Sequence, residues 1–173
     1  EVDALLHMLR CFQSDDTVHL DGAVDPLRDL ETVETELILA DLQQIDRRQP
    51  VLEKLERTGD RDVGRELSLM RRIRDCLNKG TPVRLIECTP EDQIIVNRQN
   101  FLTLKPILYI CNVDEKHAKG GNAFSDTVAE KAATDGSHPL IVSAAIEAEI
   151  AQLASADEKA EFLASLDLDK PSL

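Results

Sequence analysis

Three short apolar runs stand out along the chain, and polar residues directly follow each of them. The runs cover residues 2–12, 107–111 and 140–142. Runs of this length are typical of strands that are buried on both faces of a sheet. Because helical patterns separate each run from the next, the order strand, helix, strand, helix, strand predicts an α/β fold with a parallel sheet and right-handed crossovers.

The long region between the first two runs has the pattern of a helical hairpin. A helix is expected to begin at Pro26, since Pro suits the first turn and Asp29 complements its free N–H groups. A narrow apolar seam follows at steps of four and three, and Gly59 breaks it before a second seam. Together the seams predict an antiparallel, coiled-coil-like hairpin. They contain Ile38, Leu42, Ile45, Gln49 and Leu52 in the first arm, and Val63, Leu67, Met70 and Leu77 in the second.

Three positions decide the details of this hairpin. Pro50 should kink or interrupt the first arm, because Pro inside a helix costs about 3 kcal/mol. Ile73 and Arg74 both fit the seam position before Leu77, so the pattern leaves that choice open. Gly80 is expected to end the second helix, because helix ends favour the left-handed conformation that Gly adopts.

The remaining elements are shorter. Residues 82–88 are expected to form an extended link. A helix should follow over residues 90–101, since Thr89 and Pro90 are typical of a helix start. Further helices are predicted over residues 124–134, 146–153 and 157–166.

Composition narrows the class of protein. Apolar residues make up 42% of the chain and charged residues 31%, which is typical of a globular domain. No apolar run approaches the ~18 residues that a membrane helix needs, so no membrane partner is expected. The cysteines form no CxxC pair or zinc-binding spacing, which favours free thiols in a reducing cytoplasm. They are Cys11, Cys76, Cys88 and Cys111, of which the first and last are expected to be buried.

Charge is distributed unevenly along the chain. The net charge of −13 argues against broad affinity for nucleic acids. Residues 43–79 differ, since they hold ten Lys or Arg and seven Asp or Glu. This stretch lies in the predicted hairpin, which is therefore the candidate surface for RNA contact, with a solvated helix face as the alternative. The candidate residues are Arg47, Arg48, Arg57, Arg61, Arg65, Arg71 and Arg72.

Two polar motifs follow the second and third apolar runs. They are Asn112-Val113-Asp114-Glu115 and Ser143-Ala144-Ala145. Ligands of parallel α/β sheets bind at the carboxyl ends of the strands, so the two motifs are expected to meet there. They stand where P-loop GTPases carry the guanine-reading motifs Asn-Lys-x-Asp and Ser-Ala-Lys.

The motifs depart from the guanine-reading pattern at three positions. Glu115 replaces the Asp that accepts hydrogen bonds from guanine, while Val113 and Ala145 replace the two Lys residues. An acceptor that is displaced leaves buried donors unpaired, at a cost of about 1–3 kcal/mol each, so the preference for guanine should weaken. The amide of Asn112 can still serve either purine, since it both donates and accepts.

The same departures, together with longer blocks of sequence, resemble the YchF family of Obg-related P-loop GTPases and ATPases. The resemblance covers essentially the whole chain, with its blocks in one order. The blocks are Leu9-Arg10-Cys11-Phe12 with Asp15-Asp16, then residues 24–29 (VDPLRD), 35–42 (TELILADL), 101–106 (FLTLKP) and 143–150 (SAAIEAEI).

This resemblance implies a partial P-loop NTPase sheet with an inserted antiparallel coiled-coil hairpin. Residues 1–28 would supply the strand after switch II, residues 29–82 the hairpin, and residues 83–173 the base-recognition motifs. Members generally favour ATP and are associated with ribosomes, which strengthens the case for RNA contact by the hairpin. The implied base site consists of Asn112, Val113, Glu115, Ser143, Ala144, Ala145 and Phe12, where Phe12 flanks the adenine and the two alanines offer backbone N–H groups.

A phosphate-binding loop is not recognisable in this sequence. The nearest approach to Gly-x-x-x-x-Gly-Lys-Ser/Thr begins at Gly59, but it lacks the Lys-Ser/Thr and falls in the hairpin turn. The resemblance places the phosphate loop and the Mg²⁺ ligands before residue 1, and a TGS module after residue 173. We therefore do not expect this chain alone to hydrolyse a nucleotide.

Three functions follow from these observations. The leading hypothesis is an ATP-preferring P-loop NTPase that hydrolyses nucleotide to diphosphate and phosphate with Mg²⁺, and acts as a translation-associated switch. The first alternative is a GTP-binding GTPase of the same family. The second is a non-enzymatic helical module that binds RNA or protein.

Overall fold

The computed structural model describes residues 2–13, 24–57, 59–134 and 136–168. The predicted turn at Asp15-Asp16 lies outside the described residues. Contacts divide the chain into two compact units, each described below by itself. Unit 1 consists of Glu1–Leu5 and Glu31–Pro106, and unit 2 consists of Leu6–Leu30 and Ile107–Leu173.

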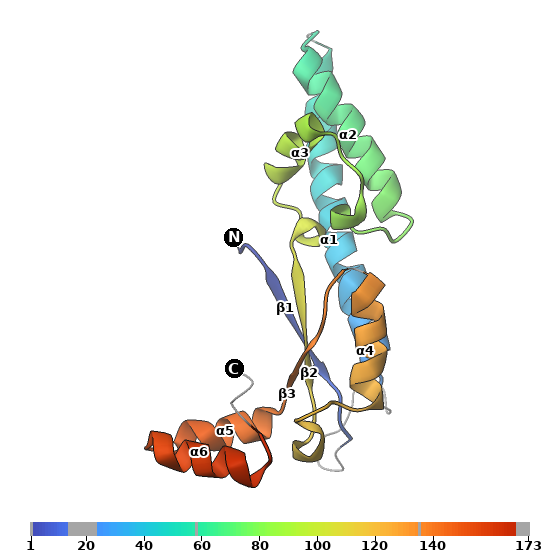
Figure 1. The fold of residues 1–173 in the computed structure, drawn as a ribbon. Coiled ribbons are helices and arrows are strands. Elements are labelled where there is room, and N and C mark those ends of the chain that lie inside the picture. Colours follow the sequence, from blue (N-terminus) through green and yellow to red (C-terminus); the bar gives the residue numbers. More distant parts are fainter. Residues whose placement is uncertain (1, 14–23, 58, 135, 169–173) are drawn as a thin grey trace. The chain divides into compact units, whose positions relative to one another are not determined.

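Two long helices form the predicted hairpin. Helix α1 spans Pro26–Glu56 and helix α2 spans Arg61–Leu77, and the two run alongside each other in opposite directions (Figure 1). Ile73 is fully buried, whereas Arg74 is exposed and pairs with Asp46 at 3.0 Å, so Ile73 takes the open seam position. The two seams meet in one core cluster, which includes Ile38, Ile45, Leu52, Leu67, Met70, Ile73 and Leu77.

The interruption predicted at Pro50 is not observed, since α1 continues through it to Glu56. Pro50 is exposed, so the carbonyl group that loses its intrahelical donor can be hydrated instead of being buried unpaired. The predicted end of α2 is confirmed. Gly80 has a φ of +77° and donates its N–H to the Leu77 carbonyl at 2.9 Å.

Three short elements pack on the hairpin in unit 1: η1 (Val83–Leu85), α3 (Pro90–Asn97) and η2 (Leu102–Leu104). The link predicted as extended therefore contains a 3₁₀ turn, and the helix predicted to reach residue 101 ends at Asn97. A right-handed helix could not continue to residue 101 in any case, because Asn100 has a φ of +55°. Phe101 turns inward and is 1% exposed in the hairpin core.

The three apolar runs form the predicted parallel sheet. Strands β1 (Leu5–Arg10), β2 (Ile107–Asn112) and β3 (Leu140–Val142) lie in the order β1-β2-β3, with β2 and β3 parallel. The Cys11 N–H donates to the Asn112 carbonyl and the Val113 N–H to the Val142 carbonyl, both at 2.8 Å, just beyond the strand ends. These bonds hold the carboxyl ends of the three strands together.

Helix α4 (Ala123–Thr134) packs on one face of this sheet. Its Val128 and Ala132 join Leu9, Tyr109 and other residues in the core of unit 2. The opposite face of β1 is exposed, since Leu6 is 70% and Met8 is 57% accessible. The prediction that this run is buried on both faces was therefore wrong, because none of the described elements covers that face.

Two further helices complete unit 2: α5 (Ala144–Gln152) and α6 (Ala156–Ser165). They meet through Ile146, Ile150 and Leu163. Ser155 begins α6 with a capping box, in which its hydroxyl and the Glu158 carboxylate each accept a backbone N–H. Within the described ranges, no helix is long and apolar enough to cross a membrane.

Candidate functional site

The two sequence motifs meet at the carboxyl end of the sheet. Asn112 is the last residue of β2, and Ser143 directly follows β3. The Asn112 side-chain oxygen accepts a hydrogen bond from the Ala144 N–H at 3.0 Å. One side chain thus joins residues that lie 32 positions apart in the sequence.

Ser143 places a polar atom in this corner that has no partner within the described chain. The residue is 1% exposed and its Oγ forms no hydrogen bond. Nor does the side chain cap α5, whose first-turn N–H groups have no intrahelical acceptor. Buried polar groups without partners are rare, and a bound polar ligand is one explanation for them.

The structure narrows the role of two predicted base contacts. Val113 is 2% exposed and packs in the core of unit 2, so its side chain supports the motif loop and does not contact a ligand. The Ala144 N–H already donates to Asn112, so it is not available to a ligand in this arrangement. Ala145 is exposed in the first turn of α5 and remains a candidate donor.

Glu115 lies on an organised loop after β2. It is exposed and opens the short turn η3 (Glu115–His117). The Asp114 carboxylate contacts the His117 ring, and the His117 N–H donates to the Asp114 carbonyl at 3.0 Å. The His117 carbonyl then accepts the Gly121 N–H at 2.8 Å, which closes the loop.

Two residues that the sequence analysis did not select organise the end of β1. The guanidinium of Arg10 lies 4.9 Å from the centre of the Phe12 ring, and its Nε donates to the Phe12 carbonyl at 3.1 Å. The Asn122 side chain donates to the Cys11 carbonyl at 2.7 Å. An Asn just before a predicted helix is a known capping pattern, and that signal could have drawn attention to Asn122.

The thiols of Cys11 and Cys111 lie in the core below these motifs, buried and free as predicted. A hydrogen bond with Cys111, together with burial, raises the pKa of the Cys11 thiol. This thiol therefore stays protonated at neutral pH. In the ranges that the structure describes, no group of three or more His, Cys, Asp or Glu residues could hold a metal ion.

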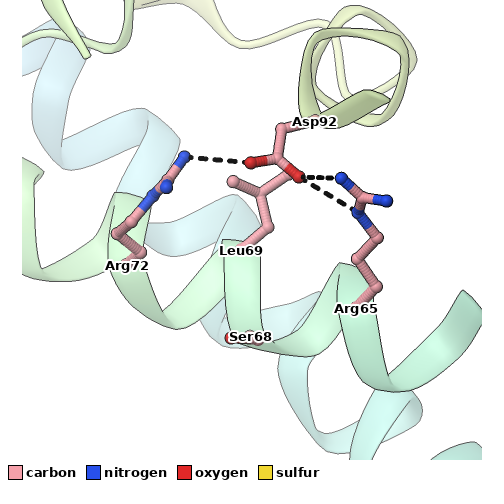
Figure 2. Close-up of a pocket in the computed structure, with 5 residues that line it drawn as sticks. All are labelled: Arg65, Ser68, Leu69, Arg72 and Asp92. Carbon is pink, nitrogen blue, oxygen red and sulfur yellow. Dashed lines mark hydrogen bonds and ion pairs between the residues drawn. The ribbon is translucent and has the colours of Figure 1, made fainter. Parts of the chain in front are cut away.

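Ion pairs engage several of the arginines predicted to contact RNA. Figure 2 shows Asp92, which is 8% exposed, between Arg65 and Arg72 at a pocket of about 210 Å³. Arg65 donates to Asp92 through Nε at 3.1 Å and Nη2 at 3.0 Å, and Arg72 donates at 3.3 Å. Burial raises the pKa of Asp92, but the hydrogen bonds of Arg65 and Thr89 and the charges of Arg65 and Arg72 outweigh it and lower that pKa.

Two more arginines are paired along the hairpin. Arg48 contacts Glu66 at 3.0 Å, and Arg71 contacts Glu53 at 3.1 Å. The other three predicted RNA contacts are exposed and form no ion pair with the described residues: Arg47, Arg57 and Arg61.

The parallel sheet, the polar motifs at its carboxyl end and the helical hairpin before β2 define part of a P-loop NTPase domain. No family model matches the chain. It is 42% identical over 173 residues to the ribosome-binding ATPase YchF of Haemophilus influenzae, and 37% identical over 175 residues to the protein of that name from Bacillus subtilis. The chain belongs to the YchF family.

The alignments cover all of this chain but only 47% of the Haemophilus protein, so the chain spans about half the length of the curated relatives it matches. Obg-like ATPase 1 of Caenorhabditis elegans is 42% identical over 115 residues, which are 66% of this chain and 29% of that protein. Among solved structures, the YchF GTPase of Schizosaccharomyces pombe has the same fold. Its TM-score is 0.85 at 22% identity, over 98% of this chain and 47% of that one.

Proposed function

We propose that this chain supplies the base-recognition part of a purine-nucleotide site. In the full-length protein, this site binds ATP in preference to GTP, and the nucleotide is hydrolysed to diphosphate and phosphate. The observation that carries the proposal is the hydrogen bond from Ala144 to Asn112, which brings both predicted base motifs to one corner of the sheet. The names of the relatives, which are ATPases and a GTPase, support it.

Each residue has a specific role in this proposal. The Asn112 side-chain NH₂ donates no hydrogen bond within the described chain, so it is free to donate to a ring nitrogen of the base. Ser143 Oγ and the Ala145 N–H supply further polar groups beside it. Phe12 forms an aromatic wall, and stacking on such a ring is worth about 1–3 kcal/mol per base.

The proposed preference for ATP rests on Glu115. A guanine-reading Asp accepts two hydrogen bonds at a fixed distance, and the extra methylene of Glu shifts the carboxylate out of that position. The groups that hold the phosphates and Mg²⁺ are proposed to come from a segment outside this chain.

Titration calorimetry of the full-length protein with ATP and GTP in Mg²⁺ tests this proposal. We expect ATP to bind at least about tenfold tighter than GTP, a difference of about 1.4 kcal/mol. Replacement of Glu115 by Asp should move the preference toward GTP. Glu149→Asp, an exposed Glu on α5, is the matched control and should leave the ratio unchanged.

Two outcomes would contradict parts of the proposal. If GTP binds tighter than ATP in the wild type, the protein is a GTPase of the same family. If neither nucleotide binds, the base-site interpretation fails, and a helical module that binds RNA or protein becomes the better hypothesis.

A second function is proposed for the hairpin, namely contact with the ribosome or another RNA in the cytoplasm. Several relatives are named ribosome-binding ATPases. Within this chain, the proposal now rests on Arg47, Arg57 and Arg61, because the other candidate arginines are engaged in ion pairs. Sedimentation with ribosomes over a range of salt concentrations tests it, since phosphate contacts weaken steeply with salt.

A further inference from the structure

The loop that follows β2 is held at both of its ends by Cys11, the residue directly after β1. The Cys11 N–H donates to the Asn112 carbonyl at 2.8 Å, at the start of this loop. The Cys11 carbonyl accepts from the Asn122 side chain at 2.7 Å, at its end. Both backbone groups of Cys11 are therefore bound by the segment that contains the motif residues 112–115.

Asn122 is itself held rigidly. Its side-chain oxygen accepts the N–H groups of Phe124 at 3.0 Å and Ser125 at 3.1 Å, as the N-cap of α4. Its own N–H donates to Ser125 Oγ at 2.7 Å. Gly121 precedes it with a φ of +77°, and a Cβ there would lie 2.4 Å from Ser125 Oγ. The side-chain NH₂ of Asn122 is thus directed from a fixed helix start to the end of β1.

Phe12 directly follows the tethered Cys11. The Arg10 guanidinium lies over the Phe12 ring, and Arg10 Nε donates to the Phe12 carbonyl. The position of the ring is therefore set by two constraints, Asn122 on the preceding peptide and Arg10 on the ring itself.

We propose that Asn122 is a positioning residue of the base site, which sets the separation between Phe12, just after β1, and the motif loop after β2. This inference rests on the proposed function, because it gives Asn122 a role only if a base binds beside Phe12. Asn122 does not touch the nucleotide. It holds one wall of the site at the spacing that an aromatic ring needs for stacking.

The test separates two roles of the Asn122 side chain, namely the hydrogen bond to the Cys11 carbonyl and the N-cap of α4. In Asn122→Ser, the hydroxyl can still cap α4, since Ser is among the best N-cap residues, but it is too short to reach the Cys11 carbonyl. The full-length variant is titrated with ATP and, separately, with inorganic tripolyphosphate in Mg²⁺. Tripolyphosphate carries the phosphate chain without a base, so it reports on the rest of the site. Asn78→Ser, an exposed residue at the end of α2, is the matched control.

We expect Asn122→Ser to weaken ATP binding about three- to tenfold, the range that one hydrogen bond commonly contributes, and to leave tripolyphosphate binding unchanged. Wild-type affinity for ATP in this variant would overturn the proposal. Equal weakening of ATP and tripolyphosphate would also overturn it, because Asn122 would then act on the fold as a whole.

A second variant keeps the proposal testable if Asn122→Ser does not fold. Asn122→Asp keeps an oxygen acceptor for the cap and replaces the donor with a carboxylate that repels the Cys11 carbonyl, so the same selective loss is expected. If both variants retain the wild-type ratio of ATP to tripolyphosphate affinity, the inference is wrong while the proposed function stands. If the wild-type protein binds tripolyphosphate but not ATP, the proposed base site itself is wrong.

Discussion

Asn112 and Ala144 are joined by a hydrogen bond of 3.0 Å, in which the side-chain oxygen of Asn112 accepts the first N–H of α5. This bond fixes the orientation of the Asn112 amide and leaves its NH₂ group as the donor toward a ligand. It also explains why an Asn at the end of β2 suits this site, since its amide carries an acceptor oxygen and a separate NH₂ donor on one short side chain.

The two halves of the Asn112 amide can be tested separately. Asn112→Asp keeps an acceptor for the Ala144 N–H but loses the NH₂ donor, so we expect ATP binding to weaken about tenfold with little change in thermal stability. Asn112→Ala removes both, and should in addition destabilise the chain by about 1 kcal/mol. Calorimetry and thermal melting of the full-length protein measure the two effects. Wild-type ATP affinity in Asn112→Asp would show that the amide does not donate to the base.

A buried acid in α1 predicts a large effect on stability. Asp41 is 1% exposed and accepts the N–H groups of Leu102 and Thr103, both at 2.8 Å, and the Thr103 hydroxyl at 2.7 Å. Asp41→Ala leaves these donors buried and unpaired, so we expect a loss of about 2–4 kcal/mol in the free energy of unfolding.

Asp46→Ala is the matched control for this prediction, because it is another Asp of α1 that pairs with an exposed Arg74. Exposed ion pairs contribute about 0–1 kcal/mol. Denaturant titration followed by circular dichroism compares the two variants. Equal losses in both would show that the Asp41 network does not hold the η2 segment against the helix.

The sequence predicted the elements that a local pattern defines. The strands before Asn112 and Ser143 were found because short apolar runs end in polar residues, and their meeting follows from the geometry of a parallel sheet. The choice between Ile73 and Arg74 could not be made, since both fit the helical period and only packing against α1 distinguishes them. The interruption expected at Pro50 was wrong for a related reason, because the cost of Pro depends on whether the carbonyl that loses its donor is exposed.

Contacts between residues that are far apart in the chain could not be predicted from the sequence. Asp92 lies 27 residues from Arg65, and no periodicity connects them, so Arg65 was interpreted as available to RNA. The tether from Asn122 to Cys11 spans 111 residues and was missed for the same reason. Residues that contact each other across a fold need a structure or an alignment to be found.

The ion pairs of Asp92 with Arg65 and Arg72 predict that the stability of the fold depends on pH. The pKa of Asp92 is lower in the folded chain than the value of about 3.9 for an unfolded Asp. Its stabilising effect is therefore fully present above about pH 4–5 and is lost as the pH falls toward the lower, folded pKa. Asp92→Asn, which has no charge, should melt at a lower temperature than the wild type at pH 7, and the difference should shrink below pH 4.

Thermal melting of both proteins from pH 7 to about pH 2.5 measures this difference. Other acids titrate in both, so only the difference between the two curves reports on Asp92. Asp75→Asn, exposed on the same helix as Arg65 and Arg72, should give no such trend. A difference that stays constant with pH would mean that the charge of Asp92 does not stabilise the fold.

The ion pairs also divide the hairpin arginines into two groups with opposite expectations. Arg47, Arg57 and Arg61 are exposed without an ion pair among the described residues, so charge reversal to Glu removes groups that could contact phosphates. We expect the triple variant to weaken ribosome association in the full-length protein, and to reduce its dependence on salt. Each lost phosphate contact should lower the slope of log affinity against log salt by about 0.7–0.9.

Reversal of Arg71 serves as the control, because this residue already pairs with Glu53 at 3.1 Å. Arg71→Glu should cost a little stability and leave ribosome association close to that of the wild type. Sedimentation at several salt concentrations compares the variants. If Arg71→Glu weakens association while the triple variant does not, the ion-paired side of the hairpin makes the contact, and its arginines exchange their carboxylate partners for phosphates on binding.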